Sequence, residues 1–157
     1  MKPFESPIYV TRPFLPPIDR FSKGLEEIWD NAWLTNDGPL LRRFETELLN
    51  YLNAQNICLF SNGTLALQIA LQGMGITGEV ITTPFTFVAT MEAVLLAGAV
   101  PVFSEVDRTL CLDPGRIADV MGPRTKAVIP VHMCGSMAHI DNIRDPVSYT
   151  HLRAHET

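Results

Sequence analysis

Short apolar runs alternate with helical patterns over residues 56–132, and this alternation most constrains how the chain can fold. The apolar runs are NICLF (56–60), EVITTP (79–84), VPVFSEV (100–106) and KAVIPVH (126–132). Between them stand three helical patterns, LALQIALQGMG (65–75), FVATMEAVLLAGA (87–99) and LDPGRIADVMG (112–122). Apolar strands joined by crossover helices are typical of a parallel sheet that is covered on both faces. We therefore expect an α/β fold with a mainly parallel sheet.

Apolar spacing also predicts which side of each helix is buried. The expected core positions are Leu67, Ala70, Leu71 and Met74 in the first helical pattern, and Met91, Val94 and Leu95 in the second. In the third pattern, Asp113 is the expected N-cap, Pro114 the first helical residue and Gly122 the end.

Two more helices are expected ahead of the alternating region. Residues 1–16 are rich in proline, which predicts an extended arm. Apolar residues then recur at helical spacing, at Ile18, Phe21, Leu25, Ile28 and Trp29 and, after the turn LTNDGP, at Leu41, Phe44, Leu48 and Leu52. Pro39 suits the first turn of the second helix.

Composition excludes several classes of protein. The net charge of −5 over 157 residues argues against a broad nucleic-acid surface. No window approaches the roughly 18 apolar residues that a membrane-spanning helix needs, and the N-terminus lacks the apolar core of a signal peptide. Cys58, Cys111 and Cys134 form no C-x-x-C pair, which predicts reduced, buried thiols in a cytoplasmic protein.

The last eleven residues, VSYTHLRAHET (147–157), do not read like the rest of the chain. They look like the translation of a transposase adaptor used in sequencing libraries, and Pro146 fits the same reading. The alternative is a natural polar C-terminus. We therefore expect residues 146–157 to be non-native and to contribute nothing to the native fold, and we expect the native protein to be cut off near Asp145.

The turn SNGT (61–64) stands between an apolar run and a helical pattern. Free backbone amides and the positive end of the helix dipole at such a turn suit a phosphate, and Gly63 allows a close approach. Ser, Asn and Thr also cap ordinary helices, and that alternative stays open. The chain contains neither a G-x-x-x-x-G-K-[ST] loop nor a G-x-G-x-x-G fingerprint.

Two aromatic residues follow the apolar run EVITTP, where an open α/β sheet places its ligands. Phe85 and Phe87 could stack on a flat heterocycle or could be ordinary core residues. His132, Cys134 and His139 match no standard zinc spacing, so we expect no metal site.

Taken together, these motifs resemble the sugar-nucleotide aminotransferases of the DegT/StrS family. LTNDGP, FE (44–45), SNGTLAL, EVITTPFTFVAT, AGAVPVF and PRTKAVIPVHMCG occur in the family's order over roughly residues 8–145. The wording of several motifs looks closest to the branch that aminates the 4-keto group of dTDP-4-keto-6-deoxyglucose. The resemblance implies that residues 17–145 are the N-terminal part of the large domain of a fold type I enzyme, which binds pyridoxal 5′-phosphate (PLP) and is usually a homodimer.

The resemblance also implies roles for individual residues. Gly63 and Thr64 would hold the phosphate of PLP, Asn62 would help to shape the turn, and Phe87 would stack on the pyridine ring. Thr35, Asn36, Gly38 and Pro39 would lie near the sugar nucleotide. His132 and Gly135 match the family's VHxxG motif, for which a structural role is the expectation, and His139 is assigned no role.

The implied reaction is a ping-pong transamination from glutamate to a keto sugar nucleotide. It needs a Schiff-base lysine and an acidic partner for the pyridinium, which in the family both lie beyond residue 145. Lys2, Lys23 and Lys126 match no such position, so we expect no catalytic residue in this chain and no catalysis by it alone. The alternatives are a PLP-dependent sugar dehydratase, a non-catalytic regulatory relative and a plain nucleotide-binding α/β domain.

Overall fold

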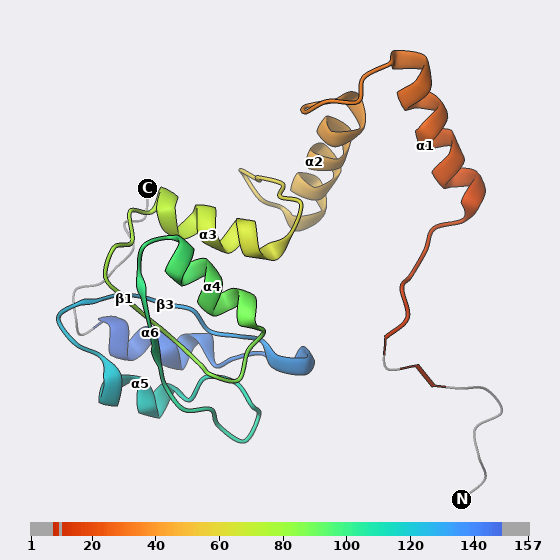
Figure 1. Cartoon of the computed structure of the whole chain (residues 1–157). Helices are drawn as coiled ribbons and strands as arrows, with labels where there is room; N and C mark the ends of the chain where they lie inside the picture. The colour runs from red at the N-terminus through yellow and green to blue at the C-terminus, as the bar shows by residue number, and fades with distance from the viewer. Residues whose placement is uncertain (1–7, 10, 149–157) are drawn as a thin grey trace, which may run out of the picture. The chain divides into compact units, whose positions relative to one another are not determined.

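The computed structural model describes residues 8–9 and 11–148, with side-chain surroundings as far as Arg144. Contacts divide the chain into two compact units, Met1–Cys58 and Leu59–Thr157 (Figure 1). None of the helices in the described ranges is long and apolar enough to cross a membrane. Residues 1–7 and 10 of the predicted arm, and residues 149–157 of the predicted non-native tail, lie outside the described residues.

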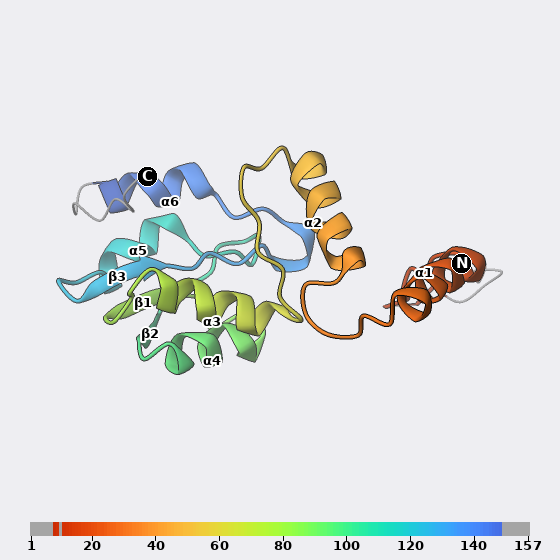
Figure 2. The same cartoon turned by 90° about the horizontal axis from the view of Figure 1, so that it is seen from above.

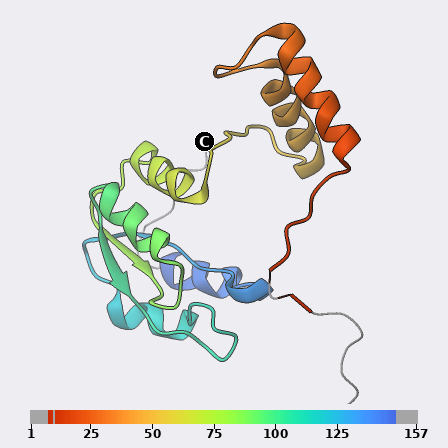
Figure 3. The same cartoon turned by 45° about the vertical axis from the view of Figure 1, so that its right-hand side comes forward.

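The first unit contains two helices, α1 (Ile18–Asn31) and α2 (Pro39–Leu52), which Figure 3 shows in orange and brown. Both predicted helices are confirmed, and Pro39 is the first residue of α2. Neither helix buries a residue completely. The apolar side predicted for α2 is therefore present in the sequence but open to solvent, and Phe44 is 53% exposed.

The second unit is a three-layer α/β arrangement, as predicted. Its parallel strands are β1 (Glu79–Thr82), β2 (Val100–Phe103) and β3 (Thr125–Val128), in the order β2-β1-β3. Figure 2 shows α3 (Gly63–Gly73) and α4 (Val88–Leu96) on one face of this sheet, with α5 (Pro114–Val120) and α6 (Ile140–Ser148) on the other. Each strand is followed by a helix or turn before the next, which is the crossover connection that parallel pairing requires.

The sheet separates two hydrophobic clusters because successive side chains of a strand point to opposite faces. Val80 packs with Leu71, Val94 and Ala99 on the face of α3 and α4. Ile81 packs on the other face with Cys111, Leu112, Ile117, Ala138 and Ile143. Both strand residues are completely buried, so β1 is the centre of the core.

The predicted core sides of α3 and α4 are only partly right. Leu71 is buried in α3 and Val94 in α4, but Met74 is 61% exposed and Leu95 is 54% exposed. Small residues, Ala89, Thr90 and Ala93, are what α4 buries instead. Small side chains allow two helices to approach closely. Large apolar residues such as Leu95, which helical spacing predicts to be buried, then point outward.

The expected boundaries of α5 are mostly confirmed. Asp113 is the N-cap, and its Oδ1 accepts a hydrogen bond of 2.9 Å from the amide of Gly115. Pro114 occupies the first position, where its missing N–H costs nothing. The helix ends at Val120, before Gly122, because Met121 already has extended backbone angles.

The expected strand NICLF is wrong: residues 56–60 are irregular. Ile57 and Leu59 are half-buried while Cys58 and Phe60 are exposed, which is the alternation of an extended segment. A strand also needs a hydrogen-bonded neighbour, and these residues pair with no strand in the described part of the chain. The prediction that all three thiols are buried fails as well, since Cys58 and Cys134 are free and exposed and only Cys111 is buried.

The strand β2 forms one edge of the sheet in the described unit. The amide of Val100 donates to the carbonyl of Gly78 at 3.0 Å, and the amide of Ser104 donates to the carbonyl of Thr82 at 2.8 Å. Because amide direction alternates along a strand, position 101 faces the outer side, and that position is a proline. The predicted strand KAVIPVH is shorter than expected and shifted by one residue, since β3 begins at Thr125.

The helix α6 runs to Ser148 and so continues past Asp145 into the first residues of the expected non-native tail (146–157). The origin of that tail remains a prediction.

Candidate functional site

The turn that precedes α3 is built around Asn62. This residue is extended, with φ −160° and ψ 164°, and its Oδ1 accepts a hydrogen bond of 2.9 Å from the amide of Leu65. Its carbonyl accepts the amide of Ala66 at 3.3 Å, which is the first helical bond. Asn62 is therefore an N-cap, so the capped-helix interpretation of this turn is correct as far as it goes.

Capping leaves two amides of the turn unused. The amides of Gly63 and Thr64 donate to no acceptor among the described residues, and the Thr64 hydroxyl has no hydrogen-bond partner there either. No atom lies within 4 Å of the position that a Cβ on Gly63 would take. The turn thus offers two backbone donors, one hydroxyl and open space at the positive end of an eleven-residue helix, which is a donor set suited to an anion.

Buried threonines fix the segment that follows β1. Thr82 and Thr83 are completely buried. The Thr82 hydroxyl donates to the carbonyl of Ile129 at 2.9 Å, and the Thr83 hydroxyl accepts from the amide of Phe85 at 3.1 Å. Side chains therefore hold the carboxyl end of β1 against the residues that follow β3, at the edge where parallel α/β sheets bind ligands.

The two aromatic residues of this segment are not core residues. Phe87 is the N-cap of α4 and is 76% exposed, and Phe85 is 46% exposed. The alternative that both phenylalanines fill the core is therefore wrong. An exposed ring at this edge is free to contact a flat ligand.

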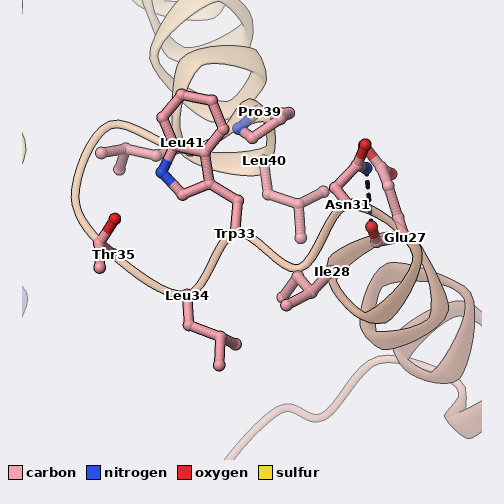
Figure 4. Close-up of a pocket in the computed structure, with 10 residues that line it drawn as sticks. Glu27, Ile28, Asn31, Trp33, Leu34, Thr35, Pro39, Leu40 and Leu41 are labelled. Atoms are coloured by element: carbon pink, nitrogen blue, oxygen red, sulfur yellow. Dashed lines mark hydrogen bonds between the residues drawn. The ribbon is translucent and has the colours of Figure 1, made fainter.

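The four residues expected near a sugar nucleotide lie in the first unit, in the loop between α1 and α2. Thr35, Gly38 and Pro39 line a cavity of about 240 Å³ together with Trp33 and residues of both helices. Asn36 is not among the lining residues. Figure 4 shows the Trp33 indole beside Pro39 and Leu41, while Leu34 points away from it.

Hydrogen bonds keep this loop in shape. The Trp33 Nε1–H donates to the carbonyl of Asn36 at 3.1 Å. Arg42 makes a bidentate pair with Asp37, with distances of 2.9 Å from Nε and 2.6 Å from Nη2. The hydrogen bond from Arg42 holds the pKa of the Asp37 carboxyl below its usual range. Sequence reasoning overlooked Trp33, Asp37 and Arg42, although an Asp and an Arg five residues apart across a helix start are a visible signal.

The histidines have separate partners. His132 Nδ1 accepts a hydrogen bond of 3.0 Å from the amide of Ala138. His139 Nε2 lies 3.7 Å from Asp107 Oδ2, and the pKa of Asp107 is lowered chiefly by the hydroxyl of Thr109. Within the described ranges, no three potential metal-binding side chains gather in one place.

Comparison with known proteins gives one family. The sequence profile of the DegT/DnrJ/EryC1/StrS aminotransferase family matches residues 18–153. Among curated proteins, a dTDP-4-amino-4,6-dideoxy-D-glucose transaminase of Shigella dysenteriae is 46% identical over 142 residues. That match covers 90% of this chain but only 39% of the relative, so the chain spans about two fifths of the relative's length.

Solved structures agree with this match. A structure of DesI in the presence of its TDP-sugar product has a TM-score of 0.85 and 36% identity, and covers 96% of this chain and 38% of that one. NtdA from Bacillus subtilis, with the bound cofactor PMP, has a TM-score of 0.82 and 32% identity, and covers 87% of this chain and 32% of that one. The fold is therefore that of part of a fold type I aminotransferase.

Proposed function

The chain belongs to the DegT/DnrJ/EryC1/StrS aminotransferase family, and we propose that it supplies the phosphate-binding part of a PLP site in an enzyme that aminates a keto sugar nucleotide. The observation that carries the proposal is the pair of unused amides at Gly63 and Thr64. The proposed amino donor is glutamate, and the proposed assembly is a homodimer.

The turn fits a phosphate in charge and in space. A dianionic phosphate is stabilised by backbone N–H groups and by the dipole at a helix N-terminus. Gly63 has no neighbour within 4 Å of its missing Cβ, so an oxygen atom can approach the backbone. Asn62 uses its side chain as the cap for Leu65, which leaves the amides of Gly63 and Thr64 without an acceptor and available to the proposed phosphate.

Phe87 is the proposed contact for the cofactor ring. Its side chain is 76% exposed and follows the carboxyl end of β1, where Thr82 and Thr83 fix the backbone. An offset aromatic stack on the pyridine ring would bury this ring face and orient the cofactor. When bound, PLP supplies an electron sink for amino-group transfer.

The chain's own contribution is binding rather than proton transfer. Lys23 lies in α1 and Lys126 in β3, and neither is close in sequence to the turn at residues 61–64. We propose no role for either lysine. We propose no catalytic residue among the described residues. The loop with Thr35, Asn36, Gly38 and Pro39 is proposed to contact the sugar nucleotide, a class of ligand that the name of the Shigella relative also specifies.

A titration of the ¹⁵N-labelled chain with PLP tests the proposal. We expect the amide signals of Gly63 and Thr64 to shift, and pyridoxal, which lacks the phosphate, to shift them much less. ATP and NAD are the competitors that a plain nucleotide-binding domain would prefer. Stronger binding of either one than of PLP, or no shift at this turn, would contradict the proposal.

The variant Gly63→Pro tests whether the amide of residue 63 binds the phosphate. Proline is favoured at the first position of a helix and removes one N–H group. Asn62 is already extended, as a residue before proline must be. We therefore expect Gly63→Pro to leave α3 intact while it weakens PLP binding about tenfold, as expected for the loss of one hydrogen bond to a charged group.

A further inference from the structure

Two side-chain hydrogen bonds hold the loop between β3 and α6: one is made by His132, and in the other the Cys111 thiol donates to the carbonyl of Ser136 at 3.5 Å. His132 follows the strand, and its Nδ1 accepts the amide of Ala138 at 3.0 Å. Ala138 itself is only 4% exposed and belongs to the core cluster around Ile81. The imidazole therefore ties the start of the loop to a residue that is fixed in the core.

Few other bonds hold this loop. Cys134 and Gly135 both have left-handed backbone angles, with φ of 50° and 86°. Within the loop the amide of Ser136 donates to the carbonyl of Met133 at 2.8 Å. A non-glycine residue in the left-handed region is disfavoured, so the closed form needs an external restraint such as the His132 bond.

The same bond defines the tautomer of the neutral ring. A nitrogen that accepts an N–H carries no proton, so the proton of the neutral ring is on Nε2. Nε2 has no hydrogen-bond partner among the described residues, and His132 is exposed. The ring thus has a defined tautomer that can be observed directly.

The loop starts at the ligand-binding edge of the sheet. Ile129, three residues before His132, donates its amide to the carbonyl of Ile81 at 2.8 Å and accepts the hydroxyl of Thr82 at 2.9 Å. The segment after β1 continues to Phe85 and Phe87. A displacement of the backbone after β3 would therefore reach the residues that precede the proposed ring contact.

We propose that His132 is a positioning residue: through Nδ1 it holds the β3–α6 loop closed and so fixes the carboxyl edge of the sheet at which the cofactor binds. The part that concerns the cofactor rests on the function proposed above. The part that concerns the loop stands on the geometry of His132 and Ala138 alone.

Three variants of His132 separate the effect of its hydrogen-bond acceptor from the effect of its side-chain volume. Asparagine places Oδ1 close to the position of Nδ1, so His132→Asn keeps the acceptor for Ala138. Glutamine places its carbonyl too far along the side chain, and alanine has no acceptor. His139→Asn is the matched control, because its ring faces Asp107 rather than Ala138.

The first readout needs no ligand. We expect long-range ¹H–¹⁵N spectra of the full chain to show the Nε2–H tautomer for His132. The Ala138 amide should exchange slowly in the parent chain, in His132→Asn and in His139→Asn, and at least tenfold faster in His132→Gln and His132→Ala. An Nδ1–H tautomer, or equal exchange in all variants, would overturn the proposal.

The second readout uses PLP on the same samples. Weaker PLP binding in His132→Gln and His132→Ala, by about threefold or more, with normal binding in His132→Asn supports the positioning role. Equal PLP binding in all variants overturns that role. If the parent chain shows no PLP shift at Gly63 and Thr64, the proposed function fails, whereas the tautomer and exchange data still decide the loop.

Discussion

Gly78 packs directly against the carbonyl oxygen of Arg124, in the space that a side chain would occupy. The contact lies where the chain enters β1, and it allows the amide of Glu79 to donate to the same carbonyl at 2.8 Å. The guanidinium of Arg124 then reaches back to Glu79, with its Nη2 at 2.7 Å from Oε1. The pairing of β1 with β3 therefore depends on the absence of a side chain at position 78.

The variant Gly78→Ala tests this dependence. A methyl group would collide with the Arg124 backbone and with Lys126, so we expect the free energy of unfolding to fall by about 1–3 kcal/mol. Gly73→Ala is the matched control, since nothing lies near its Cβ position and it is in α3. That control should raise stability by about 0.4–1 kcal/mol. Urea unfolding measures both, and equal effects would contradict the close contact.

Substitutions at Asn62 should separate the two tasks of the turn. Asn62→Ala removes the cap and should cost about 0.5–2 kcal/mol of stability. Asn62→Asp keeps a capping oxygen but adds a negative charge beside the two free amides. We expect its unfolding midpoint to match the parent chain while its affinity for PLP falls. Unchanged PLP affinity in Asn62→Asp would place the anion elsewhere.

Phe87→Ala should leave the fold intact. The ring is 76% exposed, so its removal should change the unfolding free energy by no more than about 0.5 kcal/mol. The loss of an aromatic stack of about 0.5–1.5 kcal/mol should weaken PLP binding by about two- to tenfold. Phe85→Ala, in the same segment, serves as the comparison in a fluorescence titration. A large loss of stability in Phe87→Ala would show that the ring has a packing role.

Asp107 makes stability depend on pH in the acid range. The Thr109 hydroxyl, at 2.6 Å, is the main cause that lowers the pKa of this carboxyl, and the nearby His139 lowers it further. A carboxyl with a lowered folded-state pKa adds stability that is fully present above its unfolded value of about 3.9. That stability is lost as the pH falls through the folded-state pKa.

The variant Asp107→Asn should remove this contribution to the pH dependence. Asparagine retains an oxygen for Thr109 but does not titrate. The free energy of unfolding of Asp107→Asn should therefore change less between pH 5 and pH 3 than that of the parent chain. This range brackets the usual carboxyl pKa of about 3.9. Urea unfolding at the two pH values measures the difference. Identical pH dependence in both chains would contradict the assignment to Asp107.

Local patterns in the sequence predicted most of the fold. Helical spacing located α2 and α3, although α3 begins two residues before the expected start, and Pro39 and Asp113 marked the starts of α2 and α5 because they act within a few residues of their own position. The parallel sheet followed from the alternation of strands and helices. Helix starts and the alternation of strands and helices depend on residues close together in the sequence, so they can be predicted from local patterns.

Features that depend on distant partners could not be predicted. The run NICLF has the composition of a strand, but a strand also needs a neighbouring strand to hydrogen-bond with, and composition does not show whether one is present. The buried side of α4 was predicted only in part: Val94 is buried as expected, but Thr90 and Ala93 are buried in place of Leu95. The bond from Ala138 to His132 spans a loop with a left-handed cysteine, for which no local pattern exists.

Pro101 decides how the outer strand behaves toward other chains. An incoming strand recruits the amides on the free side of an edge, and in β2 position 101 has no N–H to offer, so Phe103 is left as the sole outward donor of that strand. A single N–H donor supports few of the backbone hydrogen bonds that an added strand would need. The proline therefore disfavours the addition of a further strand at this apolar edge, where Val100 is 57% exposed.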